Sequence, residues 1–119
     1  RNATWSAAYA ILAEVQAGAE RLLAAPALQR FFDPAFYRRA WNELELTRGD
    51  GGLQRLDRLV ELDSGFWVLD YKSSGSDSGR LDAYRAQVAA YCSVVAAVFP
   101  ERPVHGALIF ADGSVVEVG

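Results

Sequence analysis

Two strand-like segments separated by three residues constrain the fold of this chain more than any other feature. Residues 53–62 and 66–72 are rich in apolar side chains, and only Asp63, Ser64 and Gly65 lie between them. A connection this short, with a glycine where a positive φ is needed, joins antiparallel strands in a hairpin. The chain is therefore expected to contain a β-sheet built around this hairpin.

A helix and an alternating segment lead into the hairpin. Apolar residues recur three and four positions apart over residues 4–25, which predicts an amphipathic helix, and a short helical turn is expected over 26–32. From residue 41 to 46 the period becomes two, which predicts a strand that the glycine-rich residues 49–52 end. One face of that strand is expected to carry Trp41, Glu43 and Glu45, and the other Asn42, Leu44 and Leu46.

A second long helix and a closing pair of strands follow the hairpin. Residues 81–99 predict a helix that Pro100 stops, after a mobile loop of Ser, Gly and Asp over 73–79. The expected buried stripe of this helix consists of Leu81, Tyr84, Val88, Tyr91, Val95 and Val98. Residues 104–110 and 115–118 predict two further strands. This order predicts an α/β fold in which helices cover at least one face of the sheet.

Length and composition predict one soluble domain over residues 1–119. A chain of 119 residues with 51% hydrophobic and 23% charged residues has the composition of a globular domain with a single core. The lone cysteine, Cys92, sits among apolar residues, so we interpret it as buried packing and exclude an intrachain disulfide or a multi-cysteine zinc site. The apolar runs are too short to span a membrane. We therefore expect a cytoplasmic protein without a membrane partner.

The basic residues of the chain are unusual in kind and number. The net charge is −3, so the chain lacks the overall positive field of a free-standing nucleic-acid-binding protein, and any DNA must be held locally or by other domains. Lys72 is the single lysine among 12 basic residues. Lysine offers a compact charge and a transferable proton that arginine lacks. The chain also begins at Arg1 and contains no methionine, which predicts an excerpt of a longer protein.

The hairpin brings two aspartates and this lysine to one face of the sheet. Asp57 and Asp70 lie equally far from the middle of the connection, so they should face each other about 5 Å apart at Cβ, where like charges repel. Lys72 lies two residues beyond Asp70 and should project from the same face, about 7 Å along the strand. Two carboxylates that share a hard divalent cation, beside a lysine, suit metal-assisted attack of water on a phosphodiester. Carboxylate spacing alone also fits a solvated salt-bridge cluster on an exposed strand face.

Four sequence motifs resemble those of one nuclease family. Residues 56–60 (LDRLV) and 68–73 (VLDYKS) closely resemble the paired motifs of the PD-(D/E)XK nucleases, in particular the RecB-like branch at the C-terminal end of AddA and RecB helicase-nucleases, which are relatives of the UvrD/Rep-type helicases. Residues 84–91 (YRAQVAAY) resemble the Q-x-x-x-Y helix of that branch, and 99–104 (FPERPV) resemble its turn into the next strand. The resemblance covers about residues 36–118. It implies a restriction-endonuclease-like αβββαβ core, with a mixed central sheet flanked by helices and an extra C-terminal strand.

The resemblance implies a role for each residue of the aspartate and lysine cluster. Asp57 and Asp70 would bind Mg²⁺ or Mn²⁺, with the backbone carbonyl of Tyr71 as a further ligand. Lys72 would position or activate the attacking water and offset negative charge on the phosphorane. By this interpretation, Asp57, Asp70 and Lys72 are catalytic residues.

Three further residues are implied, and one departure from the family is evident. Gln87 and Tyr91 would point together at the site and orient the lysine or the DNA backbone; the ordinary alternative is a core tyrosine beside a solvated glutamine. Glu43 would match the glutamate of the family and support the lysine or a metal-bound water. The family usually carries a histidine ligand before the strands, but the only histidine here is His105, in a closing strand. We expect that ligand either to lie upstream of Arg1 or to have been lost.

The resemblance finally implies a function and partners. The chain would be a metal-dependent DNA nuclease domain from the C-terminal end of a larger helicase-nuclease, weak or inactive when isolated. It would act as an exonuclease on single strands delivered by a helicase motor, in double-strand-break repair and recombination. Its partners would be single-stranded DNA ends, the helicase domains of the parent chain and an AddB-like or RecC-like subunit. The alternatives are a catalytically silent module of the same fold that binds DNA or a partner subunit, and an unrelated interaction domain that lacks the central hairpin.

Overall fold

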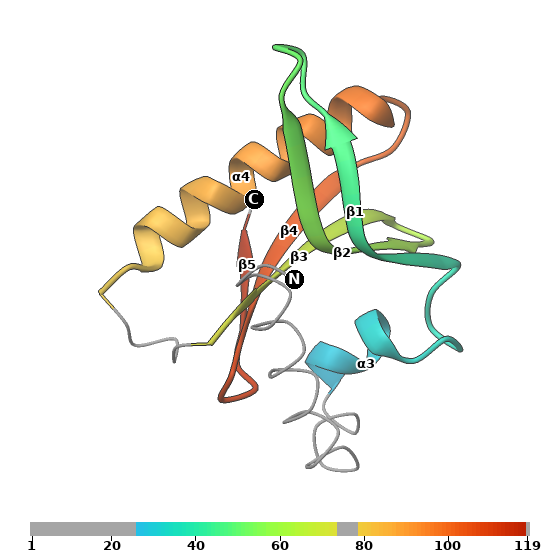
Figure 1. Cartoon of the computed structure of the whole chain (residues 1–119). Helices are drawn as coiled ribbons and strands as arrows, with labels where there is room; N and C mark the ends of the chain where they lie inside the picture. Colours follow the sequence, from blue (N-terminus) through green and yellow to red (C-terminus); the bar gives the residue numbers. More distant parts are fainter. Residues whose placement is uncertain (1–25, 74–78, 119) are drawn as a thin grey trace.

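The computed structural model describes residues 26–73 and 79–118, which form a mixed five-stranded sheet with helices packed on it (Figure 1). The elements, in chain order, are α3 (Pro26–Phe32), β1 (Arg39–Thr47), β2 (Leu53–Leu62), β3 (Gly65–Lys72), α4 (Leu81–Val98), β4 (Val104–Phe110) and β5 (Val115–Val118). The strands lie in the order β1-β2-β3-β4-β5, with β3 parallel to β4 and all other neighbours antiparallel. This confirms the predicted α/β fold with a mixed central sheet and an extra C-terminal strand. The predicted helix over 4–25 and the middle of the predicted loop, 74–78, lie outside the described residues. None of the described helices is long and apolar enough to cross a membrane.

The β2–β3 hairpin has the predicted register. Leu62 pairs with Gly65, so the turn itself consists of only Asp63 and Ser64, and it is one residue tighter than expected. Gly65 has a φ of 140°, and a Cβ at this position would collide with the carbonyl oxygen of Pro103. Glycine is required here both by the backbone angle and by the close approach of the α4–β4 connection.

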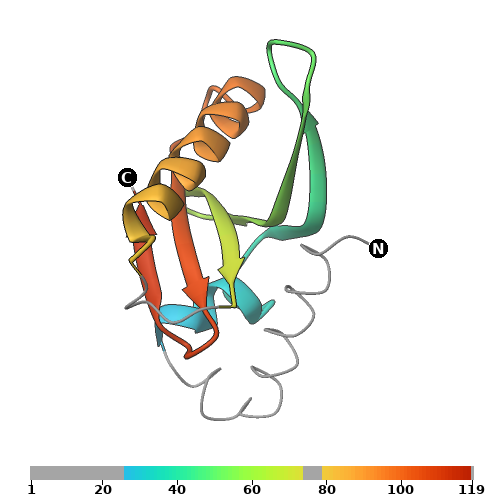
Figure 2. The same ribbon diagram turned by 60° about the vertical axis from the view of Figure 1, so that its left-hand side comes forward.

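Side chains of β3 alternate between two faces of the sheet, and each face is covered by a helix. Phe66 and Val68 pack in one hydrophobic cluster with Val95 of α4. Trp67 packs in a different cluster with Phe31 of α3. Figure 2 shows α4 running along one face of the sheet, while α3 lies on the other side of the strands. The alternation of β3 therefore decides which of its residues share a face with α4.

Helix α4 approaches β4 so closely that only glycine fits at position 106. A Cβ on Gly106 would collide with Cγ1 of Val88 and would lie 2.9 Å from Sγ of Cys92. Cys92 is packed half-buried in the α4 clusters, and burial raises the pKa of its thiol to about 11, so the thiol stays protonated. The predicted buried stripe is wrong at Val98, which is 45% exposed. Val98 lines a hollow of about 250 Å³ beside Phe99 instead of entering the core.

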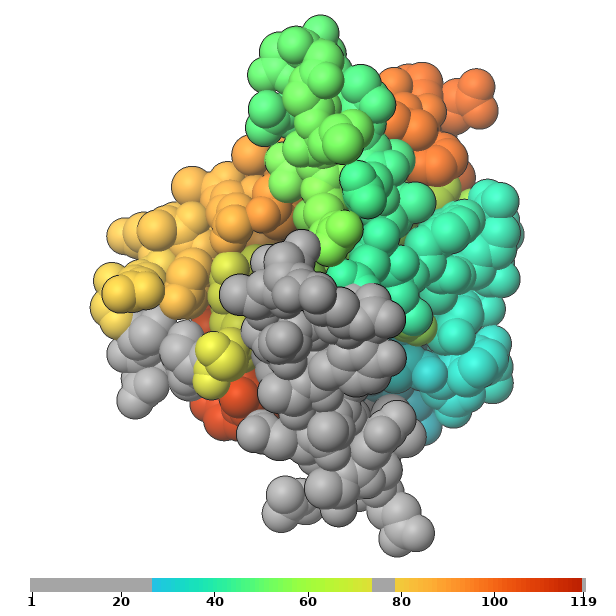
Figure 3. Space-filling model, viewed as in Figure 1, coloured from blue at the N-terminus to red at the C-terminus, as the bar shows by residue number. Residues whose placement is uncertain are grey.

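Strand β1 changes face in its middle, so the strict alternation predicted for residues 41–46 is wrong. Glu43 has a φ of 50° and is missing from the register with β2, which resumes at Leu44. As a result Trp41 and Leu44, three positions apart, pack in the same cluster. A left-handed residue that is not glycine costs about 1–2 kcal/mol, which the burial of both apolar side chains offsets. Beyond this point the hairpin of β1 and β2 bends, and its turn projects from the molecule (Figures 2 and 3).

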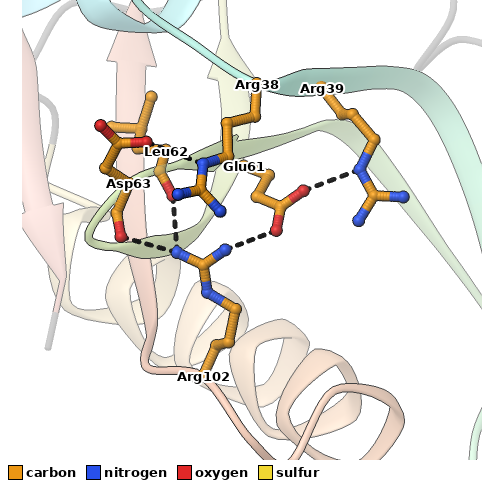
Figure 4. Close-up of polar contacts among 6 residues, drawn as sticks. All are labelled: Arg38, Arg39, Glu61, Leu62, Asp63 and Arg102. Atoms are coloured by element: carbon orange, nitrogen blue, oxygen red, sulfur yellow. Dashed lines mark hydrogen bonds and ion pairs between the residues drawn. The ribbon is translucent and has the colours of Figure 1, made fainter.

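Arg102 fastens the β2–β3 turn to the α4–β4 connection (Figure 4). Its guanidinium donates to Oε2 of Glu61 at 2.5 Å and to the carbonyl oxygens of Leu62 and Asp63 at 2.8 and 2.7 Å. Arg39 donates to Oε1 of Glu61 at 2.7 Å. The hydrogen bond from Arg39, together with the charges of Arg39 and Arg102, holds the pKa of Glu61 below its usual range. The end of the hairpin that is distant from Asp57 and Asp70 is thereby fixed.

Candidate active site

Asp57 lies where the pairing of β2 with β3 ends and the pairing of β2 with β1 is interrupted. The β2–β3 register ends at Arg58, and the β1–β2 register omits Asp57 together with Glu43 opposite it. The side chain of Asp57 takes over the missing contact, because its Oδ2 accepts a hydrogen bond of 2.9 Å from the backbone N–H of Tyr71. With 5% of its surface exposed, Asp57 is a buried carboxylate held by β3.

Asp70 follows the last pair of the hairpin on the α4 face and is also buried. Its Oδ2 lies 2.8 Å from Nζ of Lys72, which forms an ion pair. This contact lacks hydrogen-bond geometry, and no hydrogen bond within the described parts of the chain satisfies the buried Oδ2. The ammonium of Lys72 compensates the charge of this buried oxygen, but its hydrogen-bonding capacity stays unused.

The two aspartates interact, as the predicted hairpin register requires. Burial raises the pKa of Asp57 to about 7, and the hydrogen bond and negative charge of Asp70 act in the same direction. The Tyr71 amide and the positive charge of Lys72 act against this rise but do not cancel it. Near neutral pH the Asp57 carboxyl of the metal-free protein is therefore partly protonated.

Lys72 is the first member of a hydrogen-bonded chain between β3 and α4. Its Nζ donates to Oε1 of Gln87 at 2.8 Å, and Nε2 of Gln87 donates to the hydroxyl of Tyr91 at 2.7 Å. The ammonium also lies 4.4 Å from the ring centroid of Tyr84. Burial, followed by the charges of Asp70 and its neighbouring aspartate, raises the pKa of Tyr91. The structure thus brings together the predicted Lys72, Gln87 and Tyr91, and Gln87 is bonded at both ends of its amide.

Two other residues considered in the sequence lie outside this cluster. Oε1 of Glu43 is 3.4 Å from Nη1 of Arg55, and no ion pair or hydrogen bond within residues 26–73 and 79–118 joins Glu43 to Lys72. The supporting role of Glu43 stays a prediction. The ring of His105 lies 4.8 Å from that of Trp67, on the face covered by α3. His105 is therefore an ordinary strand residue on the opposite side of the sheet from Lys72.

Two neighbours of the site were not given a role from the sequence. Tyr84 was expected only as part of the buried stripe, although its position three residues before Gln87 places it on the same side of the helix. Arg58 is 7% exposed and directly follows Asp57. The available signal was an arginine between Asp57 and the apolar residues Leu59 and Val60 of the same strand.

The oxygen donors at this place fit a hard divalent cation. Asp57 and Asp70 present buried carboxylates on one face, and Asp70 has an oxygen without a hydrogen bond. Among the residues that the structure describes, no group of three or more His, Cys, Asp or Glu side chains could hold a metal. A set of two carboxylates suits Mg²⁺, which keeps several of its waters and needs few protein ligands.

Comparison with known proteins agrees with this geometry. No curated protein matches the chain. The family model of the PD-(D/E)XK nuclease superfamily matches residues 2–117. Enzymes of that superfamily generally hydrolyse nucleic acids with the help of divalent metal ions. Since the match spans nearly the whole sequence, this chain belongs to the PD-(D/E)XK nuclease superfamily.

Proposed function

We propose that the chain is a Mg²⁺- or Mn²⁺-dependent DNA nuclease domain of the RecB-like type. The observation that carries this proposal is the joint burial of Asp57 and Asp70 beside Lys72, whose ammonium is held by Gln87. A salt-bridge cluster with a purely structural role would have no need to bury two carboxylates against each other. The arrangement is explained if a cation and a phosphate are its ligands.

The metal would be held by Asp57, Asp70 and the backbone carbonyl of Tyr71. When bound, the cation supplies a Lewis acid that polarises the scissile phosphate and lowers the pKa of a coordinated water. The Tyr71 amide keeps Asp57 in place for this role, since it donates to Oδ2 at 2.9 Å. Because burial raises the pKa of Asp57 to about 7, the proton that this carboxyl holds must leave before the carboxylate can serve as a ligand.

Lys72 would position the attacking water and stabilise negative charge that develops on the phosphate. An ammonium has three donors, and the neighbours Asp70 and Gln87 occupy two directions around Nζ. The third N–H remains for water or a phosphate oxygen. Tyr91 would orient the ammonium of Lys72 indirectly, through Gln87. Because Nε2 of Gln87 donates to the Tyr91 hydroxyl, Oε1 of Gln87 must face the lysine.

The biological setting is inferred from the resemblance to AddA and RecB. We infer a single nuclease domain at the C-terminal end of a helicase-nuclease that acts in the cytoplasm on DNA ends during double-strand-break repair and recombination. A helicase motor would deliver single strands for exonucleolytic cleavage, and an AddB-like or RecC-like subunit would complete the assembly. The net charge of −3 supports this arrangement, because other domains would then supply most phosphate contacts.

End-labelled single-stranded DNA, duplex DNA and RNA, incubated with the full chain and Mg²⁺ or Mn²⁺, test the proposal. We expect cleavage of single-stranded DNA that EDTA abolishes and that Asp70→Asn lowers at least about a hundredfold. Asp63→Asn is the matched control, because Asp63 is an exposed carboxylate at the other end of the same hairpin. Stepwise products from one free end would indicate an exonuclease. A chain that binds DNA but neither binds Mn²⁺ nor cleaves would support the catalytically silent alternative.

A further inference from the structure

Arg58 is a buried cation on the residue next to Asp57. It is 7% exposed, and no carboxylate within residues 26–73 and 79–118 forms an ion pair with it. Burying a charge without an ionic partner is unfavourable unless dipoles and rings compensate it. A leucine or valine at this position would fill the core without that penalty, so the position of Arg58 calls for a specific explanation.

The guanidinium of Arg58 contacts three separate segments. Its Nε donates to the carbonyl of Phe31 at the end of α3 at 3.1 Å, and its Nη1 donates to Oδ1 of Asn42 in β1 at 2.8 Å. Its Cζ lies 5.1 Å from the ring centroid of Phe32 and 5.5 Å from that of Tyr37. A planar fork can donate in two directions and stack on rings at the same time, which no other side chain can do. Arg58 therefore fastens β2 to α3 and to β1.

Arg58 lies where the hydrogen-bonded pairing of β2 with β3 ends and the pairing of β2 with β1 is interrupted. Arg58 is paired with Asn42 on one side and Leu69 on the other, and it is the last residue of β2 with both neighbours before the bend. The next residue toward the β1–β2 turn, Asp57, has no partner in either register. The backbone of Asp57 is consequently held through its two neighbours in sequence: Leu56, whose side chain is buried under α4, and Arg58, whose side chain contacts α3 and β1.

Arg58 also supports the Asp57 carboxylate indirectly, through contacts that include Phe32 and Tyr71. Phe32, which lies under the guanidinium, stacks on the ring of Tyr71 with a centroid distance of 6.3 Å. The amide of Tyr71 is the donor that holds Oδ2 of Asp57. Arg58 thus supports both the carboxylate and the group that fixes it, although its own side chain lies on the opposite face of the sheet.

We infer that Arg58 is a positioning residue that aims the Asp57 carboxylate at the Tyr71 amide and at the metal. This inference rests on the proposed function, since it assigns the metal to Asp57. Residues that orient a metal ligand from behind typically change metal affinity by about 10- to 100-fold when they are replaced. A purely structural arginine would change stability and leave the affinity of the folded protein unchanged.

Titration calorimetry with Mn²⁺ on the full chain separates these two roles. We expect Arg58→Gln to weaken Mn²⁺ binding at least about tenfold at a temperature where the variant is folded, and Arg58→Lys not to restore it, because an ammonium lacks the planar fork. Arg102→Gln is the matched control: Arg102 also bridges several acceptors, but at the far end of the hairpin. It should lower the melting temperature and leave Mn²⁺ affinity at the parental value. If Arg58→Gln behaves as Arg102→Gln does, the inference is wrong.

Hydrogen exchange of the Tyr71 amide gives a second readout that needs no metal. We expect the Tyr71 amide to exchange faster in Arg58→Gln than in the parent. The increase in exchange rate should be smaller in Asn42→Ala, which removes one hydrogen bond of Arg58 and keeps the arginine buried. Exchange at Tyr71 in Arg102→Gln should follow global stability only. Parental exchange in both Arg58→Gln and Asn42→Ala would overturn the inference. A parent chain that binds no Mn²⁺ would instead refute the proposed function, and the exchange data would still decide whether Arg58 positions Asp57.

Discussion

The ammonium of Lys72 is held by Asp70 and Gln87 and lies beside the ring of Tyr84. Nζ lies 2.8 Å from Oδ2 of Asp70, 2.8 Å from Oε1 of Gln87 and 4.4 Å from the ring centroid of Tyr84. We expect Lys72→Arg to lower the rate of DNA cleavage at least about a hundredfold, because a guanidinium is larger, does not release its proton and would displace the attacking water. Single-turnover cleavage with Mn²⁺ measures the effect.

Thermal unfolding and Mn²⁺ titration of the same variant provide the control. Both should stay near the parental values, since arginine keeps the positive charge and can still pair with the buried carboxylate of Asp70. A Lys72→Arg enzyme that cleaves at the parental rate would reduce the cluster to a salt bridge.

Asp57 is expected to make the metal-free protein sensitive to pH. Burial, with the hydrogen bond and charge of Asp70, raises the pKa of Asp57 to about 7, whereas an unfolded aspartate titrates near pH 4. The folded state holds this proton more tightly, so its stabilising effect is complete below about pH 4 and is lost as the pH rises through 7. Asp57→Asn keeps an oxygen for the Tyr71 amide and removes the buried charge.

We therefore expect Asp57→Asn to be more stable than the parent at pH 8 in EDTA by at least about 1 kcal/mol, which is the free energy of somewhat less than one pKa unit. Urea unfolding at pH 8 and pH 5 measures the difference, which should shrink at the lower pH. Asp63→Asn, which changes an exposed carboxylate, should show no such trend. Equal stability of Asp57→Asn and the parent at pH 8 would show that the charged, buried carboxylate of Asp57 does not destabilise the metal-free protein.

At the level of the elements, the sequence predicts best what depends on neighbours along the chain. The β2–β3 register follows from a turn of two residues after Leu62, and α4 ends just before Pro100, as expected. The change of face at Glu43 could not be read from β1 alone, because it depends on α4 covering Trp41 and the residues after it. The alternating pattern was present in the sequence, but burial under a distant helix determined the conformation.

The candidate site shows the same division. Asp57, Asp70 and Lys72 lie on one hairpin, so their common face follows from strand geometry. The role inferred for Arg58 depends on α3 and on Asn42, which come from other parts of the sequence and meet it only in the folded chain. No periodicity within β2 could have revealed these partners.

Helix α4 and β4 are expected to tolerate no side chain at position 106. Gly106→Ala would force its Cβ into Val88 and Cys92, and overpacking of this kind costs about 1–3 kcal/mol. Because α4 carries Gln87 and Tyr91, cleavage per folded molecule should fall as well. Thermal unfolding and single-turnover cleavage are the measurements.

Two further variants test the cause of that loss. Gly106→Ala combined with Val88→Ala should be more stable than Gly106→Ala alone, since the second change removes the colliding methyl group. Gly79→Ala should be neutral, because a Cβ there has nothing within 4 Å. If the double variant is less stable than the single one, the close approach of α4 is not the reason for glycine.

At the level of the whole molecule, most arginines are already engaged with carboxylates. Those in ion pairs are Arg30, Arg38, Arg39, Arg48, Arg55 and Arg102. In the described part of the chain, Arg80 and Arg85 are exposed and form no ion pair, and both belong to the beginning of α4. Over residues 26–73 and 79–118, few cations are therefore free to meet a DNA backbone.

Binding of single-stranded DNA should consequently be weak and only mildly dependent on salt. Phosphate contacts from Arg80 and Arg85 contribute about −1.4 to the slope of a plot of log affinity against log salt concentration. Fluorescence anisotropy with the Asp70→Asn chain in EDTA avoids cleavage during the measurement. Arg80→Gln and Arg85→Gln should each make the slope shallower by about 0.7, and Arg48→Gln, which affects an arginine paired with Asp50, should not. A much steeper parental slope would mean that the paired arginines also bind DNA.

Both carboxylates of the site belong to one hairpin with a two-residue turn, and this has a consequence for the order of folding. Pairing of β2 with β3 closes a short loop, whereas the parallel pairing of β3 with β4 must wait until α4 has crossed over. We therefore expect Asp57 and Asp70 to meet before Lys72 contacts Gln87 and before α4 covers the sheet. Their repulsion then raises the free-energy barrier to folding. A shared proton or divalent cation should lower this barrier, and so increase the folding rate as well as the stability of the folded chain.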